Sequence, residues 1–120
     1  MTILLVEDDN FFQKFYSTKL RDSSITVEIA SNGEEGLQKM RETHFDLVLL
    51  DLVMPRVDGF EVLRVMNQDA ELKKIPVLVF STLSQEGDIE KAKQLGAKDY
   101  MNKTFFNFEE LMSKIKALTA

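Results

Sequence analysis

Short apolar runs alternate with amphipathic stretches along the whole chain. The runs cover Ile3 to Val6, Val27 to Ala30, Leu47 to Leu50, Val77 to Phe80 and, more weakly, Tyr100 to Met101. Strands that alternate with helical stretches are typical of a parallel sheet whose connections are crossover helices. The third and fourth runs are apolar at every position, which favours central strands covered on both faces.

Between these runs, apolar residues recur at spacings of three and four, which predicts helices with one apolar face. They are Phe12, Phe15, Tyr16 and Leu20; Leu37 and Met40; Phe60, Leu63 and Met66; Ile89, Ala92 and Leu95; and Phe108, Leu111, Met112, Ile115 and Leu118. Candidate helix ends agree with this pattern. N-caps are expected at Asn10, Asn32, Ser84 and Asn107, and a C-terminal glycine at Gly96.

The chain shows no internal repeat, low-complexity tract or linker, so we expect residues 1–120 to form one domain. Right-handed crossovers predict an α/β, doubly wound (βα)5 fold. This is a flavodoxin-like three-layer sandwich with a five-stranded parallel sheet in the order 2-1-3-4-5. In such sheets, ligands bind outside the carboxyl ends of the strands.

Polar side chains follow several of the predicted strands. They are Glu7, Asp8 and Asp9 after the first run, Asp51 after the third, Ser81 and Thr82 after the fourth, and Lys103 after the fifth. A single polar residue at a strand end is ordinary. Because the carboxyl ends of parallel strands share one edge, this set predicts a site where carboxylates, hydroxyls and an amine meet.

Converging carboxylates raise one another's pKa unless a positive charge lies among them. Oxygen ligands of this kind suit Mg²⁺, which leaves coordination positions open for phosphate oxygens. The chain has 0 cysteines and 1 histidine, His44, which disfavours metals that prefer thiolate or imidazole ligands. With Lys103 and Ser81 beside it, Asp51 is placed to be a nucleophile that forms an aspartyl phosphate.

The composition limits the partners of this site. The chain has 15 Lys and Arg against 20 Asp and Glu, a net charge of −5, which argues against direct binding of nucleic acid. No stretch approaches the roughly 18 apolar residues of a membrane span, and the sequence turns acidic at Glu7 before a signal peptide could develop. We expect a soluble cytoplasmic protein without direct membrane contact.

The strand-end residues also carry a resemblance to a known family. Glu7-Asp8, Ser81, Lys103 and the string Asp51-Leu52-Val53-Met54-Pro55-Arg56-Val57-Asp58-Gly59 occur in this order. The pattern resembles the receiver domain of bacterial two-component response regulators, which is CheY-like. The resemblance extends from the first predicted strand to the last predicted helix.

The resemblance implies that Asp51 accepts a phosphoryl group from the phosphohistidine of a sensor histidine kinase or a phosphotransfer protein. It further implies that Mg²⁺ is held by the side chains of Glu7, Asp8 and Asp51 and by the backbone carbonyl of Val53. Asp9 matches no ligand of the family and is expected to be solvated near the first helix.

The family also implies a switch. Ser81 would hydrogen-bond a phosphoryl oxygen, Lys103 would pair with the phosphoryl group, and Tyr100 matches the switch aromatic residue. Movement of these groups would change the face formed by the fourth helix, fifth strand and fifth helix, where an output partner or effector domain binds. Such a protein is a signalling domain rather than an enzyme, and is a monomer or a phosphorylation-dependent dimer.

The chain departs from the family pattern in two places. Thr104 follows Lys103 where proline is usual, and a cis bond to a residue other than proline costs about 2.5–4 kcal/mol; the isomer of this bond stays open. Val53 and Leu83 flank the path of a hydrolytic water and cannot hydrogen-bond it through their side chains. They predict slow loss of the phosphoryl group.

Other functions fit the sequence less well. Aspartate-nucleophile phosphatases commonly carry a second Asp two residues after the first, where this chain has Val53. A flavodoxin-like electron carrier needs a phosphate-binding loop after the first strand, where this chain has Glu7, Asp8 and Asp9. A phosphorylation-independent docking module of the same fold remains the alternative. Separately, Phe11, Phe12, Phe15 and Tyr16 are expected to lie mostly in the core, but not all four can point inward, and one that is partly exposed would mark a docking surface.

Overall fold

The computed structural model describes residues 1–82, 86–103 and 107–120. In chain order its elements are β1 (Thr2–Val6), α1 (Asn10–Asp22), β2 (Thr26–Ala30), α2 (Gly33–Glu42), β3 (Leu47–Leu50), α3 (Gly59–Asn67), the short 3-10 helix η1 (Leu72–Lys74), β4 (Val77–Ser81), α4 (Glu86–Gln94), β5 (Asp99–Asn102) and α5 (Phe108–Thr119). Each predicted apolar run lies within one of these strands.

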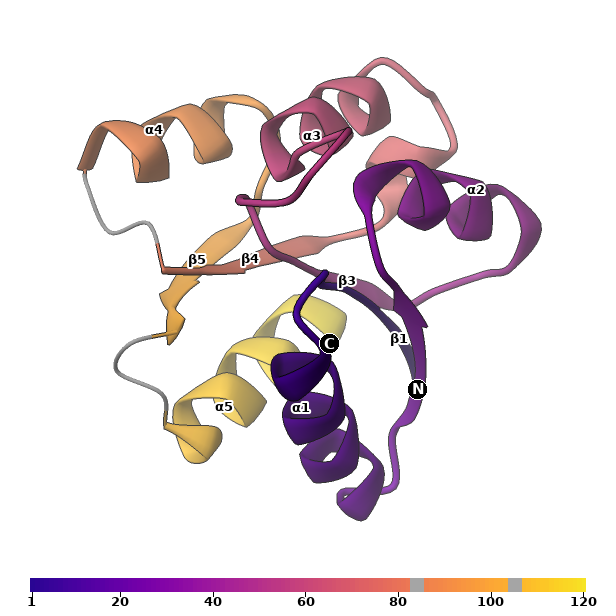
Figure 1. Ribbon diagram of the computed structural model, residues 1–120, viewed down its shortest axis with the longest axis vertical. Helices are drawn as coiled ribbons and strands as arrows, with labels where there is room; N and C mark the ends of the chain where they lie inside the picture. Colours follow the sequence, from indigo (N-terminus) through magenta and orange to yellow (C-terminus); the bar gives the residue numbers. More distant parts are fainter. Residues whose placement is uncertain (83–85, 104–106) are drawn as a thin grey trace.

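The strands form one parallel sheet in the order β2-β1-β3-β4-β5. In the centre of the sheet, Leu5 of β1 lies opposite Ile29 of β2 and Leu49 of β3, and Leu50 of β3 lies opposite Val79 of β4. Figure 1 shows α1 and α5 on one side of the sheet and α2, α3 and α4 on the other. The predicted doubly wound fold is confirmed.

The core has two halves because successive side chains of a strand point to opposite faces. In β1, Leu4 and Val6 pack toward α2, α3 and α4, whereas Ile3 and Leu5 pack toward α1 and α5. All residues of Leu47–Leu50 are buried in the same alternating way. This explains why the central strands are apolar at every position.

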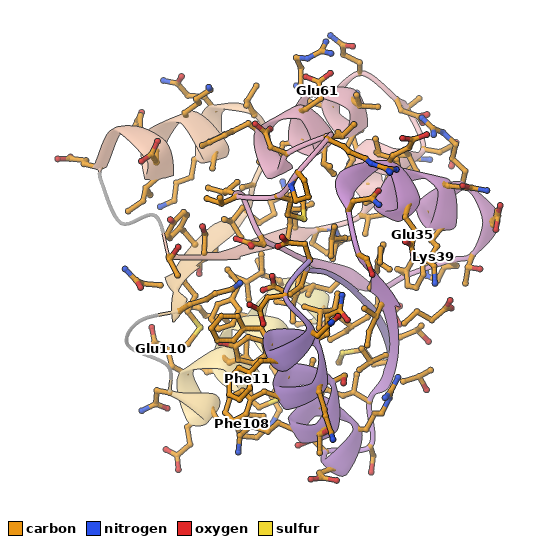
Figure 2. The ribbon with its side chains drawn as sticks, in the orientation of Figure 1. Phe11, Glu35, Lys39, Glu61, Phe108 and Glu110 are labelled. Carbon is orange, nitrogen blue, oxygen red and sulfur yellow. The ribbon has the colours of Figure 1, made fainter. Side chains whose placement is uncertain are left out.

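The side chains labelled in Figure 2 lie on both helix layers. Glu35, Lys39 and Glu61 are on the side of α2 and α3, and Phe11, Phe108 and Glu110 are on the side of α1 and α5 (Figure 2). Phe11 is exposed, as the sequence led us to expect for part of the aromatic stretch. None of the helices in the described part of the chain is long and apolar enough to cross a membrane.

Most of the predicted helix ends are correct. The side chain of Asn32 accepts a hydrogen bond from a backbone N–H at the start of α2, and Asn107 does the same for α5. Gly96 follows α4 with φ +113°, a left-handed conformation that favours glycine. Ser84 lies outside the described residues.

The predicted N-cap of α1 was wrong by one position. Asp9, not Asn10, caps this helix: its Oδ1 accepts from the backbone N–H of Phe11 at 2.8 Å and of Phe12 at 3.1 Å. Asp and Asn are equally good capping residues, so residue type alone did not separate them. The carboxylate adds a favourable interaction with the helix dipole.

Asp46 joins the amino ends of β1 and β3. Its carboxylate accepts from the backbone N–H of Thr2 at 2.8 Å, and its own N–H donates to the Thr2 carbonyl at 2.8 Å. The hydrogen bond from Thr2 holds the pKa of the Asp46 carboxyl below its ordinary value, and the nearby His44 contributes. The charged form of Asp46 therefore stabilises the folded state.

We predict that Asp46→Asn lowers the free energy of unfolding by about 1 kcal/mol at neutral pH, a value reduced for the partial exposure of the carboxylate. Because the folded-state pKa is depressed, this contribution is present above the ordinary pKa and is lost as pH falls through the folded-state pKa. Urea unfolding at several pH values measures it. Asp22→Asn, at the exposed end of α1, is the control, and a gap that persists in strong acid contradicts the prediction.

Candidate functional site

The predicted site residues lie at the carboxyl edge of the sheet. The N–H of Glu7 donates to the last carbonyl of β2 at 2.9 Å, and the N–H of Asp51 donates to the last carbonyl of β1 at 3.0 Å. These bonds continue the sheet ladder one step beyond β1 and β3 and fix both residues at the edge. Ser81 is the last residue of β4, and Lys103 directly follows β5.

The structure brings Glu7, Asp8 and Asp51 together. Each offers a carboxylate oxygen, and these oxygens all lie within 4.8 Å of one another. Glu7 and Asp51 are buried, with exposed fractions of 1% and 6%, whereas Asp8 is exposed. A cluster of hard oxygen donors that is open to solvent on one side fits Mg²⁺, which keeps several water ligands.

The ammonium of Lys103 lies among these acids. Its Nζ contacts Oε1 of Glu7 and lies 3.4 Å from Oδ2 of Asp51, and its side chain is only 4% exposed. The contact with Glu7 joins residues that are 96 positions apart and was not predicted from the sequence. This ammonium partly offsets the negative charge of the two buried carboxylates.

Glu7 is the acid most affected by burial. Loss of solvation raises its pKa to about 7, although the hydrogen bond and charge of Lys103 lower it, and the charge of Asp51 raises it further. The charge on the Glu7 carboxyl group therefore depends on the cation that faces it.

The start of α3 packs against the backbone of Asp51 and Leu52. The N–H of Gly59 donates to the carbonyl of Leu52 at 3.1 Å, and a Cβ added to Gly59 would lie 2.3 Å from the carbonyl oxygen of Asp51. Asp58 caps α3 by accepting from the N–H of Glu61 at 2.9 Å. The Asp58-Gly59 pair thus lets α3 start directly against the residue that carries the central carboxylate.

The loop between Asp51 and α3 also presents Val53. Its N–H lies 3.4 Å from Oδ1 of Asp51, and its side chain is exposed. Arg56 in the same loop has φ 64°, a left-handed conformation in which a residue other than glycine is strained. The loop thus combines a hydrogen bond to the Asp51 carboxylate with one strained backbone position.

Ser81 and Tyr100 lie on neighbouring strands. Ser81 is fully buried, and Tyr100 pairs with Val79 of β4 while its ring packs toward the α2, α3 and α4 layer. The Tyr100 hydroxyl is buried. Burial raises its pKa, whereas a hydrogen bond with the neighbouring Ser81 lowers it.

Sequence reasoning missed two residues that support the site from α1. Nε2 of Gln13 donates to the backbone carbonyl of Glu7 at 2.6 Å and also to Ser31. The ring centroid of Phe12 lies 4.6 Å from Nζ of Lys103. Both residues lie in the first turn of α1, which begins at the carboxyl edge of the sheet, and this position could have indicated that they lie near the site.

Comparison with known proteins identifies the family of this arrangement. A model of the response regulator receiver domain matches residues 3–116. The chain belongs to this family. Response regulator receiver domains are signalling domains of two-component systems, so this receiver domain takes part in phosphorelay signalling.

Individual relatives agree with this assignment. The receiver domain is 36% identical over 116 residues to a probable transcriptional regulator, ycf29, of Porphyra purpurea, and the match covers 97% of this chain and 55% of that protein. The chain spans about half the length of the curated relatives it matches.

Solved structures show the same fold. The chemotaxis protein CheY4 of Vibrio cholerae has a TM-score of 0.90 at 28% identity, covering 98% of this chain and 97% of that one. The receiver domain of the sensor histidine kinase PA1611 of Pseudomonas aeruginosa has a TM-score of 0.90 at 25% identity, covering 98% and 96%. That structure has a magnesium ion coordinated in its active site cleft.

Some sequence predictions fall on undescribed residues. Leu83 and Thr104 lie outside the described part of the chain, so the position of Leu83 and the isomer of the Lys103–Thr104 bond stay predictions. Asp9 is exposed at the start of α1, where it was expected, but it also has the capping role described above.

We predict that Gly59→Ala lowers the free energy of unfolding of the receiver domain by about 1–3 kcal/mol, because the new methyl group overlaps backbone atoms of Asp51 and Leu52. Gly87→Ala is the matched control. A Cβ there meets nothing within 4 Å, so this helix substitution should be neutral or stabilise by up to about 1 kcal/mol. Urea unfolding compares them, and equal effects of the two substitutions would contradict the close approach at Gly59.

Proposed function

We propose that this receiver domain, residues 1–120, accepts a phosphoryl group on Asp51 from a phosphohistidine of a sensor histidine kinase or phosphotransfer protein. The observation that carries the proposal is the cluster of Glu7, Asp8 and Asp51 with the Lys103 ammonium at one edge of the sheet. An oxygen of Asp51 attacks phosphorus, the oxygen–phosphorus bond forms, and the phosphorus–nitrogen bond breaks with its electron pair passing to the imidazole.

In this proposal, Mg²⁺ is held by the side chains of Glu7, Asp8 and Asp51 and by the backbone carbonyl of Val53. When bound, Mg²⁺ would offset the negative charge of the carboxylates and of the incoming phosphoryl oxygens, which otherwise repel one another. The exposure of Asp8 supports the assignment, because it leaves the cluster accessible to an ion and a donor. The close approach of Gly59 to the backbone of Asp51 supports a fixed position for this residue.

Lys103 and Ser81 then bind the phosphoryl group, which adds about −1.5 to −2 charge at Asp51. Movement of Ser81 changes the surroundings of the buried Tyr100 hydroxyl, which interacts with Ser81 from the neighbouring strand. Reorientation of Tyr100 alters the face formed by α4, β5 and α5, where an effector domain or output partner binds. Within α4, Ala92 is the residue that is buried. A helix with so few buried contacts can shift more easily than one that is packed along its length.

The proposed setting is the cytoplasm, with the receiver domain as a monomer or a phosphorylation-dependent dimer. A chain that spans about half the length of its relatives fits output through an attached effector domain or a separate partner. The domain assists its own phosphorylation and slow dephosphorylation, and its output is a change in binding.

We predict that wild-type protein incubated with Mg²⁺ and acetyl phosphate gains the mass of one phosphoryl group, measured on the intact protein. Asp51→Ala removes the acceptor and should gain none, and chelation of Mg²⁺ should slow the reaction strongly because, among the described residues, Lys103 alone then opposes the charge of the carboxylates. Asp22→Asn should behave as wild type. Unmodified wild-type protein would instead favour a phosphorylation-independent docking module.

We also predict that the phosphoryl group is lost slowly, because Val53 presents an apolar side chain, 53% exposed, beside Asp51. Val53→Gln supplies a group that can orient a water molecule and should shorten the lifetime by about tenfold. Val53→Leu, which cannot hydrogen-bond water, is the control. Intact mass after removal of the phosphodonor measures the decay, and loss from the wild-type protein within seconds would refute the prediction.

A further inference from the structure

A column of aromatic rings leads from the core to the site. Phe80 of β4 lies edge-on to Tyr16, with ring centroids 4.7 Å apart, and Tyr16 stacks on Phe12 at 5.6 Å with an interplanar angle of 7°. Phe12 ends the column in the first turn of α1, where its ring faces the Lys103 ammonium at 4.6 Å. The Phe12 ring therefore contacts Tyr16 within the aromatic column and the Lys103 ammonium at the site.

The Lys103 ammonium has little contact with water. On one side it meets the carboxylates of Glu7 and Asp51, and its side chain is 4% exposed. The face of an aromatic ring attracts a cation electrostatically, and the attraction is strongest where water is excluded. An aliphatic side chain of similar size would fill the same space without attracting the charge.

We propose that Phe12 is a positioning residue that holds the Lys103 ammonium at the phosphorylation site through its aromatic face. This inference rests on the proposed function, in which Lys103 meets the phosphoryl group on Asp51. A ring face attracts a cation that lies over it within about 6 Å of the ring centroid. At 4.6 Å, the Lys103 ammonium has room to move from Glu7 toward a phosphoryl oxygen on Asp51 within that range.

The start of α1 keeps Phe12 in place. Oδ1 of Asp9 accepts from the Phe12 N–H at 3.1 Å, which fixes the backbone of the first turn. One turn later, Phe15 has a comparable ring contact with the ammonium of Lys19 at 5.1 Å. Phe12 and Phe15 are both partly buried, so Phe15 is a matched control for the loss of an aromatic ring from α1.

A double-mutant cycle measures the interaction directly. Phe12→Leu is made with and without Lys103→Met, and the unfolding equilibrium constants are obtained from urea titrations. We expect Phe12→Leu to destabilise the protein about tenfold more when Lys103 is present than in the Lys103→Met background. Phe15→Leu should have the same effect in both backgrounds. Equal effects of Phe12→Leu in both backgrounds would overturn the proposal.

A second measurement decides the matter if Lys103→Met does not fold. The rate of phosphorylation by acetyl phosphate should fall about tenfold in Phe12→Leu and return to near the wild-type rate in Phe12→Tyr, which keeps a ring face. Phe15→Leu should react at the wild-type rate. Equal rates in Phe12→Leu and Phe12→Tyr would overturn the positioning role. If wild-type protein is not phosphorylated at all, the proposed function fails, whereas the double-mutant cycle still tests the contact of Phe12 with Lys103.

Discussion

Glu7 and Asp51 are buried side by side at the carboxyl edge of the sheet, and the Lys103 ammonium faces both carboxylates. Removal of charged groups from water is unfavourable unless an opposite charge or hydrogen bonds replace the water. In a parallel sheet this unfavourable desolvation affects several acids at one place, because acids that follow different strands lie at the same edge. The burial of these acids therefore depends on a cation among them, and even so the pKa of Glu7 is raised to about 7.

The two sides of the site are held in different ways. Asp51 is fixed by backbone contacts, since α3 starts at Gly59 directly against its carbonyl oxygen. On the other side, α4 buries little beyond Ala92. Lys103 connects the two sides, because it follows β5 and reaches the carboxylate that follows β1. In the proposed mechanism, a change of charge at Asp51 acts through Lys103 on the side of the site where α4 buries little.

The sequence was sufficient for the fold and for the edge where the site lies, because strand and helix periodicities are local and the carboxyl ends of parallel strands must meet. It did not reveal the partners of individual side chains. The contact between Lys103 and Glu7 joins residues 96 positions apart, and the approach of Phe12 depends on how α1 is rotated against the sheet. The N-cap at Asp9 rather than Asn10 was missed for a different reason, since both residue types cap helices equally well.

In the proposed mechanism, the ammonium of Lys103 and a divalent cation are attracted to the same carboxylates, whose oxygens lie within 4.8 Å of one another. A divalent ion bound there would weaken the attraction between the Glu7 carboxylate and the Lys103 ammonium. The attraction of the Phe12 ring does not depend on the charge of the carboxylates. The ring can therefore keep the ammonium at the edge of the sheet after the acids are neutralised, where it is available to the negative charge that arrives with a phosphoryl group.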